Sequence, residues 1–233
     1  MNKESNTYTM IYAAVIVVLV ALLLAFTSQL LRPKQERNEA IDKKRQILTS
    51  INIVSSNSDA EQFYRQYVLD SYLVNSKGDK VEGNAFDTEL SAELEKPLAE
   101  RKYPVFEAVI DGNKKYILSL RGVGLWGPIW GFISLDDDKN TVYGASFAHE
   151  GETPGLGAEI DRPVFGKKFI GKKVFNSEGK FTSIAIVKAG KTVQGQDYVD
   201  GISGGTITSQ GVDAMLKSGI GAYEAFLSKR VNK

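Results

Sequence analysis

The stretch Asp200-Gly-Ile-Ser-Gly-Gly-Thr-Ile-Thr-Ser-Gln-Gly-Val212 joins a glycine turn to an apolar periodic segment. The apolar side chains that follow recur at the spacing of one helix face, which predicts an amphipathic helix. Ser203, Thr206 and Thr208 then lie at or just before the helix N-terminus. The apolar face is formed by Val212, Met215, Leu216, Ile220, Tyr223, Phe226 and Leu227.

This predicted helix start, with Gly204 and Gly205 directly before Thr206, suits a phosphate group. The first backbone N–H groups of a helix have no intrahelical acceptor, and the positive end of the helix dipole lies there. Glycine lets the backbone come close to a bulky anion because it has no side chain. A hydroxyl-capped helix after a glycine turn, without a ligand, explains the same residues. The spacing alone therefore leaves both interpretations open.

The composition of the 233 residues excludes several classes of site. The net charge is +1, so nothing in the composition suggests a nucleic-acid surface. The chain has no cysteine, so disulfides, thiolate catalysis and cysteine-ligated iron–sulfur clusters are excluded. His149 is the single histidine, which rules out a His-rich metal site and bis-histidine haem ligation within one chain. We predict no metal site and no catalytic residue.

An uncharged segment near the N-terminus predicts a membrane anchor. Residues 5–31 carry no charge, and Met10 to Phe26 are almost wholly apolar, which is long enough for one helix across a bilayer. A cleaved signal peptide is the alternative, but Leu30-Leu31-Arg32-Pro33 offers no small-residue cleavage site. We expect a tail at 1–9, one transmembrane helix at 10–31 and a single-pass protein in the lipid bilayer.

The charges beside this segment bear on which side the rest of the chain faces. Lys3 and Glu4 precede the segment, whereas six basic residues follow it within a short distance. The positive-inside rule taken literally places the following domain in the cytoplasm, although long domains translocate largely regardless of flanking charge. The six residues are Arg32, Lys34, Arg37, Lys43, Lys44 and Arg45.

The remaining pattern predicts an α+β fold. Residues 32–100 read as a charged stalk and docking helices, and residues 101–233 as the functional domain. Successive β-prone runs, with helices at either end, indicate an antiparallel sheet with flanking helices, preceded by the one transmembrane helix. The expected strands are 105–110, 115–120, 130–135, 141–147 and 181–187.

Two further motifs carry candidate binding residues. Gly122-Val-Gly-Leu-Trp-Gly-Pro-Ile-Trp130 sets Leu125 and Trp126 among glycines, and such a loop can lie against a flat ring system. A turn with a core tryptophan is the simpler alternative, and the spacing does not decide between them. We identify no Gly-x-Gly-x-x-Gly fingerprint of a strand-to-helix turn, so we expect this chain not to bind NADH itself.

The second motif is His149-Glu-Gly-Glu-Thr-Pro-Gly-Leu-Gly157. It begins like the metalloprotease motif His-Glu-x-x-His, but the second histidine is absent and Pro-Gly is incompatible with the required helix. Its turn offers N–H groups to an anion or a ring carbonyl. The candidate residues are Glu152, Thr153, Gly155, Leu156 and Gly157.

The Ser-Gly-Gly-Thr that follows Asp200-Gly201 resembles the flavinylation motif of the FMN-binding domain family, Asp-Gly-x-Ser/Thr-Gly-Ala-Thr. Gly205 stands where that family usually has alanine. The resemblance implies FMN joined through its phosphate to Thr206 as a phosphoester. Ser203, Gly204, Gly205 and Thr208 would surround the attachment point, and the two loops, including Leu125, Trp126 and residues 152–157, would line the isoalloxazine ring.

The order of Gly-Leu-Trp-Gly, Gly-Glu-Thr-Pro-Gly-Leu-Gly and Ser-Gly-Gly-Thr behind one anchor is similar to the C subunits of bacterial sodium-translocating NADH:quinone oxidoreductases. That resemblance implies an inner-membrane complex subunit with a periplasmic domain, flavinylated by a flavin transferase with FAD as donor. It would relay electrons between an iron–sulfur centre and another covalent flavin, with NADH as ultimate donor and ubiquinone as acceptor. The chain would be part of an oxidoreductase and translocase without being catalytic alone with NADH.

Three alternatives remain open or are excluded at this point. The G subunits of Rnf electron-transport complexes share the last two motifs, so an Rnf-type subunit with covalent FMN is one alternative. A membrane-anchored, non-redox module that binds a phosphate or nucleotide at the same helix start is another. A hydrolase with Ser203 or Thr206 as nucleophile lacks a base, because His149 lies in a different loop.

Overall fold

The computed structural model describes residues 6–229, and the chain divides into two units, at residues 1–43 and 44–233. The helix α1 (Asn6–Ser50) supplies the first unit and the opening residues of the second. It is long and apolar enough to cross a membrane, and it is the one such helix in the described part of the chain. The expected span at 10–31 lies inside it, but the helix begins at Asn6 within the expected tail and continues unbroken past Pro33.

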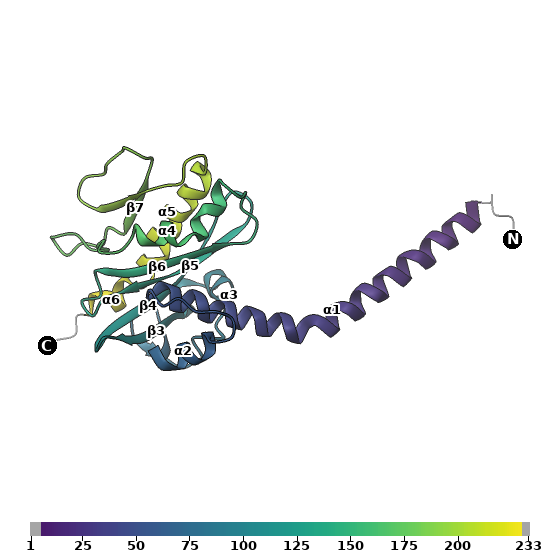
Figure 1. The fold of residues 1–233 in the computed structure, drawn as a ribbon, viewed down its shortest axis with the longest axis horizontal. Coiled ribbons are helices and arrows are strands. Elements are labelled where there is room, and N and C mark those ends of the chain that lie inside the picture. Colours follow the sequence, from purple (N-terminus) through teal and green to yellow (C-terminus); the bar gives the residue numbers. More distant parts are fainter. Residues whose placement is uncertain (1–5, 230–233) are drawn as a thin grey trace. The chain divides into compact units, whose positions relative to one another are not determined.

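The second unit is built on a six-stranded sheet in the order β2-β1-β3-β4-β5-β6. Strands β3 to β6 of this sheet are labelled in Figure 1. All neighbouring strands in the sheet are antiparallel, which confirms the predicted fold class. The strands are β1 (Val68–Val74), β2 (Lys80–Val81), β3 (Tyr103–Ile110), β4 (Asn113–Val123), β5 (Pro128–Leu135) and β6 (Val142–His149).

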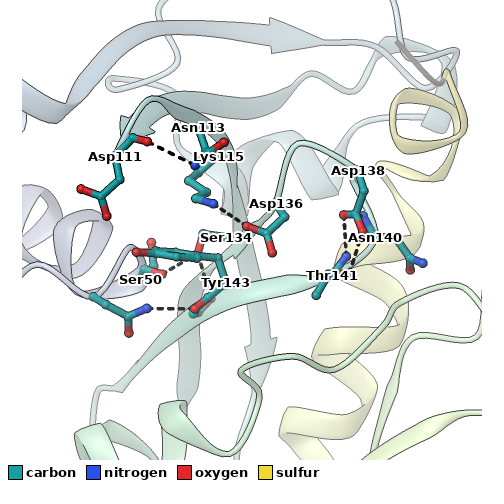
Figure 2. A network of polar contacts seen from close by, with 12 residues as sticks. Ser50, Asp111, Asn113, Lys115, Ser134, Asp136, Asp138, Asn140, Thr141 and Tyr143 are labelled. Carbon is teal, nitrogen blue, oxygen red and sulfur yellow. Dashed lines mark hydrogen bonds and ion pairs between the residues drawn. The ribbon is translucent and has the colours of Figure 1, made fainter. Parts of the chain in front are cut away.

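Short polar turns set the register of these strands. Asp111 and Gly112 connect β3 to β4, and both have positive φ angles of 50° and 77°, as the two-residue hairpin with right-handed strand twist requires. Between β5 and β6, the Asp138 carboxylate accepts hydrogen bonds from the backbone N–H groups of Asn140 and Thr141 and from the Thr141 hydroxyl (Figure 2). Side-chain acceptors of this kind stabilise a turn locally.

Both faces of the sheet are covered, because consecutive strand residues point to opposite sides. Ile117 and Leu118 show this on β4, since they are fully buried in different apolar clusters. One face packs against α4 (Pro163–Lys167), α5 (Thr206–Gly221) and α6 (Glu224–Ser228). The other packs against the last residues of α1 and against α2 (Ala60–Tyr67).

The end of α1 is an integral part of the second unit. Ile47 and Leu48 are completely buried. The Ser134 hydroxyl donates a hydrogen bond to the Ser50 carbonyl (Figure 2), and a side chain on Gly144 would lie 2.4 Å from the same carbonyl oxygen. The apolar cluster on this face therefore needs the end of the long helix.

The remaining elements differ from the sequence-based expectation in two places. The expected strand 181–187 is β7 (Ile184–Val187), which pairs in parallel with β8 (Asp197–Asp200) in a separate two-stranded sheet. The interval 32–100, expected to hold only stalk and docking helices, also contributes β1 and β2 to the main sheet. The other elements are α3 (Leu90–Glu95) and the 3-10 helices η1 (Leu98–Glu100) and η2 (Gly157–Asp161).

Candidate functional site

The helix α5 begins at Thr206, within the stretch where the sequence predicted a helix start. Gly205 is its N-cap residue, and no side chain caps the helix. The backbone N–H groups of the first turn consequently keep their donor capacity, and the positive dipole end is open. The preceding turn is held by the Ser209 hydroxyl, which accepts a hydrogen bond from the Ile202 N–H at 2.9 Å.

The three candidate hydroxyls at this helix start are not equivalent. Ser203 and Thr206 are exposed to solvent, whereas Thr208 is only 1% exposed. The Thr208 Oγ1 donates a hydrogen bond to Oε2 of Glu152 at 2.5 Å. A buried hydroxyl that is already bonded to a carboxylate is a poor acceptor of a bulky group, so Ser203 and Thr206 are the accessible pair.

Glu152 lies where the candidate segments meet. Its Oε1 accepts a hydrogen bond from the Trp126 backbone N–H at 2.9 Å, its Oε2 accepts the Thr208 hydroxyl, and the residue is 5% exposed. Burial raises the pKa of the Glu152 carboxyl, but the hydrogen bonds from Thr208, Trp126 and Leu125 outweigh burial and lower this pKa. The group is therefore a buried carboxylate held by neutral donors.

The glycines of both loops make room for this carboxylate. A Cβ atom on Gly124 would lie 2.4 Å from Glu152 Oε1, and one on Gly157 would lie 2.3 Å from Oε2. The Gly157 position would also clash with Thr208 Oγ1 at 2.4 Å. Two glycines that the sequence associated with ring binding are thus explained by the close packing of one acidic side chain.

The turn at residues 153–157 rests on the glycine pair before α5. A Cβ atom on Gly204, whose φ is +77°, would lie 2.6 Å from Leu156 Cδ2. The turn uses its own donors, since the Leu156 N–H bonds to the Thr153 carbonyl and the Gly155 N–H bonds to Glu159 Oε1. These two N–H groups are therefore not free to bind an anion, contrary to the sequence-based expectation, and the turn presents the Leu156 side chain instead.

Large apolar side chains remain exposed on the segments that converge on Glu152. Leu125, Trp126 and Leu156 are 47%, 67% and 43% exposed. Ile207, which is 53% exposed, adds a fourth such side chain that the sequence analysis did not select. Ile207 could have been selected from the sequence, because it is an apolar residue that does not belong to the buried apolar face of α5. Exposed apolar groups gathered beside polar ones are typical of a ligand or partner site.

The two tryptophans of the glycine-rich motif have different environments. Trp126 is exposed in the loop between β4 and β5, whereas Trp130 lies in β5 and its Nε1 donates to Gln46 Oε1 at 2.9 Å. Gly122-Val-Gly-Leu-Trp-Gly127 does have the Gly-x-Gly-x-x-Gly spacing, so the spacing itself is present in the chain. It joins two antiparallel strands, not a strand and a helix, and so is not a dinucleotide-binding turn.

The two ring nitrogens of His149 face other groups than the candidate hydroxyls. Its Nδ1 accepts a hydrogen bond from the Glu152 backbone N–H at 3.2 Å, and its Nε2 lies 3.8 Å from Asp161 Oδ2. Within residues 6–229 no group of three or more histidine, cysteine, aspartate or glutamate side chains is placed to hold a metal ion. The chemistry of this site therefore falls to the exposed hydroxyls and the open helix start.

Comparisons with known proteins assign this arrangement to a class. Residues 124–221 match the sequence profile of the FMN-binding domain family. The matched range starts in the loop between β4 and β5, contains Glu152 and the turn after it, and ends with α5. An exposed hydroxyl at an open helix start, next to exposed apolar side chains, fits the phosphate and the flat ring of FMN. The fold and site thus define an FMN-binding domain.

Relatives extend the match to nearly the whole chain. Over 96% of its length it is 31% identical to the C subunit of the Na(+)-translocating NADH-quinone reductase of Haemophilus ducreyi, of which 95% is covered. The crystal structure of the corresponding C subunit from Parabacteroides distasonis matches with 56% identity and a TM-score of 0.80, over 84% of this chain and 96% of that one. The Shewanella oneidensis NqrC structure, at 24% identity and a TM-score of 0.70, shares the fold over 86% of this chain and 100% of its own. The chain belongs to the family of Na(+)-translocating NADH-quinone reductase C subunits, which confirms the resemblance found in the sequence.

Proposed function

We propose that this chain is an electron-carrying subunit of a sodium-translocating NADH:quinone reductase, with FMN joined through its phosphate to the Thr206 hydroxyl. The observation that carries the proposal is an exposed hydroxyl on the first residue of α5, at a helix start that no side chain caps. The relatives that align along nearly the whole chain are named as C subunits of that complex. The family motif selects Thr206 over Ser203, the other exposed hydroxyl.

Each part of FMN would meet a suitable surface. The open first-turn N–H groups and the helix dipole would stabilise the phosphate by roughly 0.3–1 kcal/mol at an exposed terminus. Gly204 and Gly205 add no side chain of their own directly before Thr206, Leu156 packs against Gly204, and Ser203 precedes this pair in the chain. The exposed faces of Leu125, Trp126 and Leu156, with the turn at Thr153 and Gly155, would line the isoalloxazine ring, whereas Gly157 is buried against Glu152. When bound, the flavin supplies the electron-transfer chemistry, and the chain supplies position and electrostatics.

Attachment would be the work of a separate flavin transferase with FAD as co-substrate. The Thr206 oxygen would form the new P–O bond as the phosphoanhydride bond of FAD breaks. AMP would leave with the bonding electron pair, and the hydroxyl proton would pass to a base of the transferase. This chain would contribute the accessible Thr206 hydroxyl.

The anchor suggests how the subunit works in its complex. With α1 in the inner membrane and the domain in the periplasm, the flavin would relay electrons between an iron–sulfur centre of membrane subunits and a second covalent flavin. NADH would be the ultimate donor and ubiquinone the acceptor, through the other subunits. Protease added to spheroplasts should then digest the domain, and complete protection in intact spheroplasts would contradict the periplasmic placement.

Peptide mass mapping tests the attachment directly. The full chain is expressed with and without a flavin transferase, denatured, washed and digested. We expect a mass increase corresponding to FMN on the peptide containing Thr206, only when the transferase is present. The same increase on Ser203 or Thr208 would refute the choice of residue. A colourless, unmodified chain in the presence of an active transferase would favour a non-redox phosphate- or nucleotide-binding module.

A further inference from the structure

We propose that Glu152 is a positioning residue, which ties the Trp126 loop to the first turn of α5 without touching the flavin. The inference rests on the attachment of FMN at Thr206 and deepens that proposal. It gives Glu152 a role different from the ring contact expected from the sequence. The Trp126 loop comprises residues 123–127, which are the last residue of β4 and the four residues before β5.

Both carboxylate oxygens of Glu152 are already engaged by protein donors. Oε1 accepts from the Trp126 N–H at 2.9 Å, and Oε2 accepts from the Thr208 hydroxyl at 2.5 Å. The close approach of Gly124 and Gly157 encloses the group further, and the residue is 5% exposed. An enclosed carboxylate with both oxygens in use has no free face for a ring that lies at the surface.

The Trp126 loop depends on this carboxylate at its tip. Its base packs on α5, where a Cβ atom on Gly211 would lie 2.3 Å from the Val123 carbonyl oxygen. Its interior is closed by a bond from the Gly124 N–H to the Gly127 carbonyl at 2.8 Å. The Trp126 ring is 67% exposed and so is not fixed by core packing. The bond from the Trp126 N–H to Glu152 therefore determines where the tip lies relative to the helix that carries Thr206.

A carboxylate suits this position better than an amide. The groups that bond to its oxygens are donors, namely the N–H groups of Leu125 and Trp126 and the Thr208 hydroxyl, and His149 lies close enough to favour the charged form as well. A carboxylate accepts on both oxygens, whereas glutamine accepts on one atom and donates from the other. Glu152→Gln should therefore keep part of the connection, and Glu152→Ala should remove it. Thr208→Val is the matched control for the loop side, because it deletes the bond to α5 and leaves the Trp126 bond in place.

Hydrogen exchange on the full chain, expressed without transferase, tests the connection in the absence of flavin. Glu152→Ala should speed amide exchange in residues 123–127 by about tenfold, since a hydrogen bond to a charged group is lost. Glu152→Gln should give an intermediate rate, Thr208→Val a rate near wild type, and the β3–β4 peptides an unchanged rate that reports intact folding. Wild-type exchange of 123–127 in folded Glu152→Ala would overturn the proposal. If Glu152→Ala does not fold, Glu152→Gln carries the test in the same way.

The flavinylated full chain supplies a readout that general folding does not move. Glu152→Ala should shift the flavin absorption maximum and midpoint potential, and Glu152→Gln should restore part of the shift. Thr208→Val removes the bond from Glu152 to α5 and should shift both properties in the same direction as Glu152→Ala. Identical flavin properties in all three variants would overturn the positioning role. If wild-type protein takes up no FMN while the exchange differences hold, the proposed function fails and the connection through Glu152 stands. If FMN is on Thr206 and exchange does not respond, only the positioning role fails.

Discussion

Two buried charged side chains at opposite ends of β5 show how differently one domain treats a charge. Glu152, near the start of β5, is held by donors from the Trp126 loop and α5. Lys139, beyond its other end, directs Nζ to the carbonyls of Phe226 and Lys229, both at 3.3 Å, and to the Phe226 ring at 4.0 Å. Neither forms an ion pair within the part of the chain that the structure describes.

The difference lies in what each charge connects. The acceptors of Lys139 all belong to one C-terminal segment around α6, so its ammonium group caps a helix end that already packs on the sheet. Glu152 joins segments that are far apart in the sequence and that carry exposed apolar side chains. The first arrangement stabilises the core, and the second shapes a surface. Variants at the two ends should therefore separate stability from flavin chemistry.

The largest effect is expected at the Glu152 end, from Thr206→Ala. Loss of the hydroxyl removes the atom that would bear the phosphorus, so covalent flavin should fall from full occupancy to none. Flavin fluorescence of the denatured chain on a gel measures it. Thr208→Val, which alters a buried hydroxyl in the same first turn of the helix, should keep the flavin. Retention of covalent flavin in Thr206→Ala would contradict the site.

Lys139→Ala tests the opposite end. It removes two charge-assisted hydrogen bonds and the stem that covers the Phe226 ring, so the free energy of unfolding should fall by about 2–3 kcal/mol. Lys139→Met keeps the stem and should lose only about 1 kcal/mol. Denaturant unfolding of the full chain in detergent measures both. Flavin content and absorption should equal those of the wild type. A folded Lys139 variant without flavin would show that the Lys139 end also affects flavin attachment.

Gly157→Ala sharpens the comparison within the Glu152 end. The added methyl would lie 2.3 Å from the Glu152 carboxylate and 2.4 Å from Thr208 Oγ1, so the connection must shift. We expect a loss of about 1–3 kcal/mol in stability together with an altered flavin spectrum. Gly151→Ala is the matched control, because its nearest neighbour would be 4.0 Å away. Equal behaviour of the two variants would show that the close packing around Glu152 carries no function.

The smallest effect is the dependence of stability on pH. Hydrogen bonds lower the pKa of Glu152 below its ordinary 4.5 despite burial. Its stabilisation is thus complete above pH 4.5 and is lost as the pH falls through the folded-state pKa. Burial lowers the pKa of Lys139 below 10.5, so in the alkaline window beneath that value the unfolded chain binds more protons and stability rises with pH. Unfolding curves of Glu152→Gln should show a smaller acid loss than wild type, since carboxyl groups such as Glu93 and Asp138 keep their lowered pKa values, and those of Lys139→Met a smaller alkaline gain.

Much of the fold could be predicted from the sequence because its signals are local. The Asp111-Gly112 turn, the apolar runs of β3 to β6 and the periodic stripe of α5 each specify an element within a few residues. By contrast, β1 follows α2 directly, so the first apolar residues of β1 continue the helical pattern of α2. The strand therefore has no separate signal in the sequence. The separate pairing of β7 with β8 depends on tertiary contacts that no short window contains.

The candidate site divides in the same way. Thr206 and the glycines before it could be selected from a motif at a helix start, and the structure places that start at Thr206. The bond between Thr208 and Glu152 spans 56 positions, so neither residue indicates the other in the sequence. The close packing of Glu152 against Gly124 and Gly157 appears only in the folded chain, since Glu152 is distant from Gly124 in the sequence. Without that contact, the sequence suggested that the two glycines make room for a flat ring.

The buried end of α1 has a practical consequence for preparing the domain without its membrane segment. Ile47, Leu48 and Ile51 are completely buried, and the Ser50 carbonyl accepts a hydrogen bond from the Ser134 hydroxyl. A fragment that starts after Ser50 would lack Ile47 and Leu48, so the apolar side chains that pack against them would be exposed to solvent. Exposed apolar surface of this kind promotes aggregation. The better cleavage point lies inside the helix, before Lys44, where the two units divide. A fragment prepared without the membrane segment should therefore start at Lys44 and keep the last seven residues of α1, which the sequence analysis assigned to the stalk.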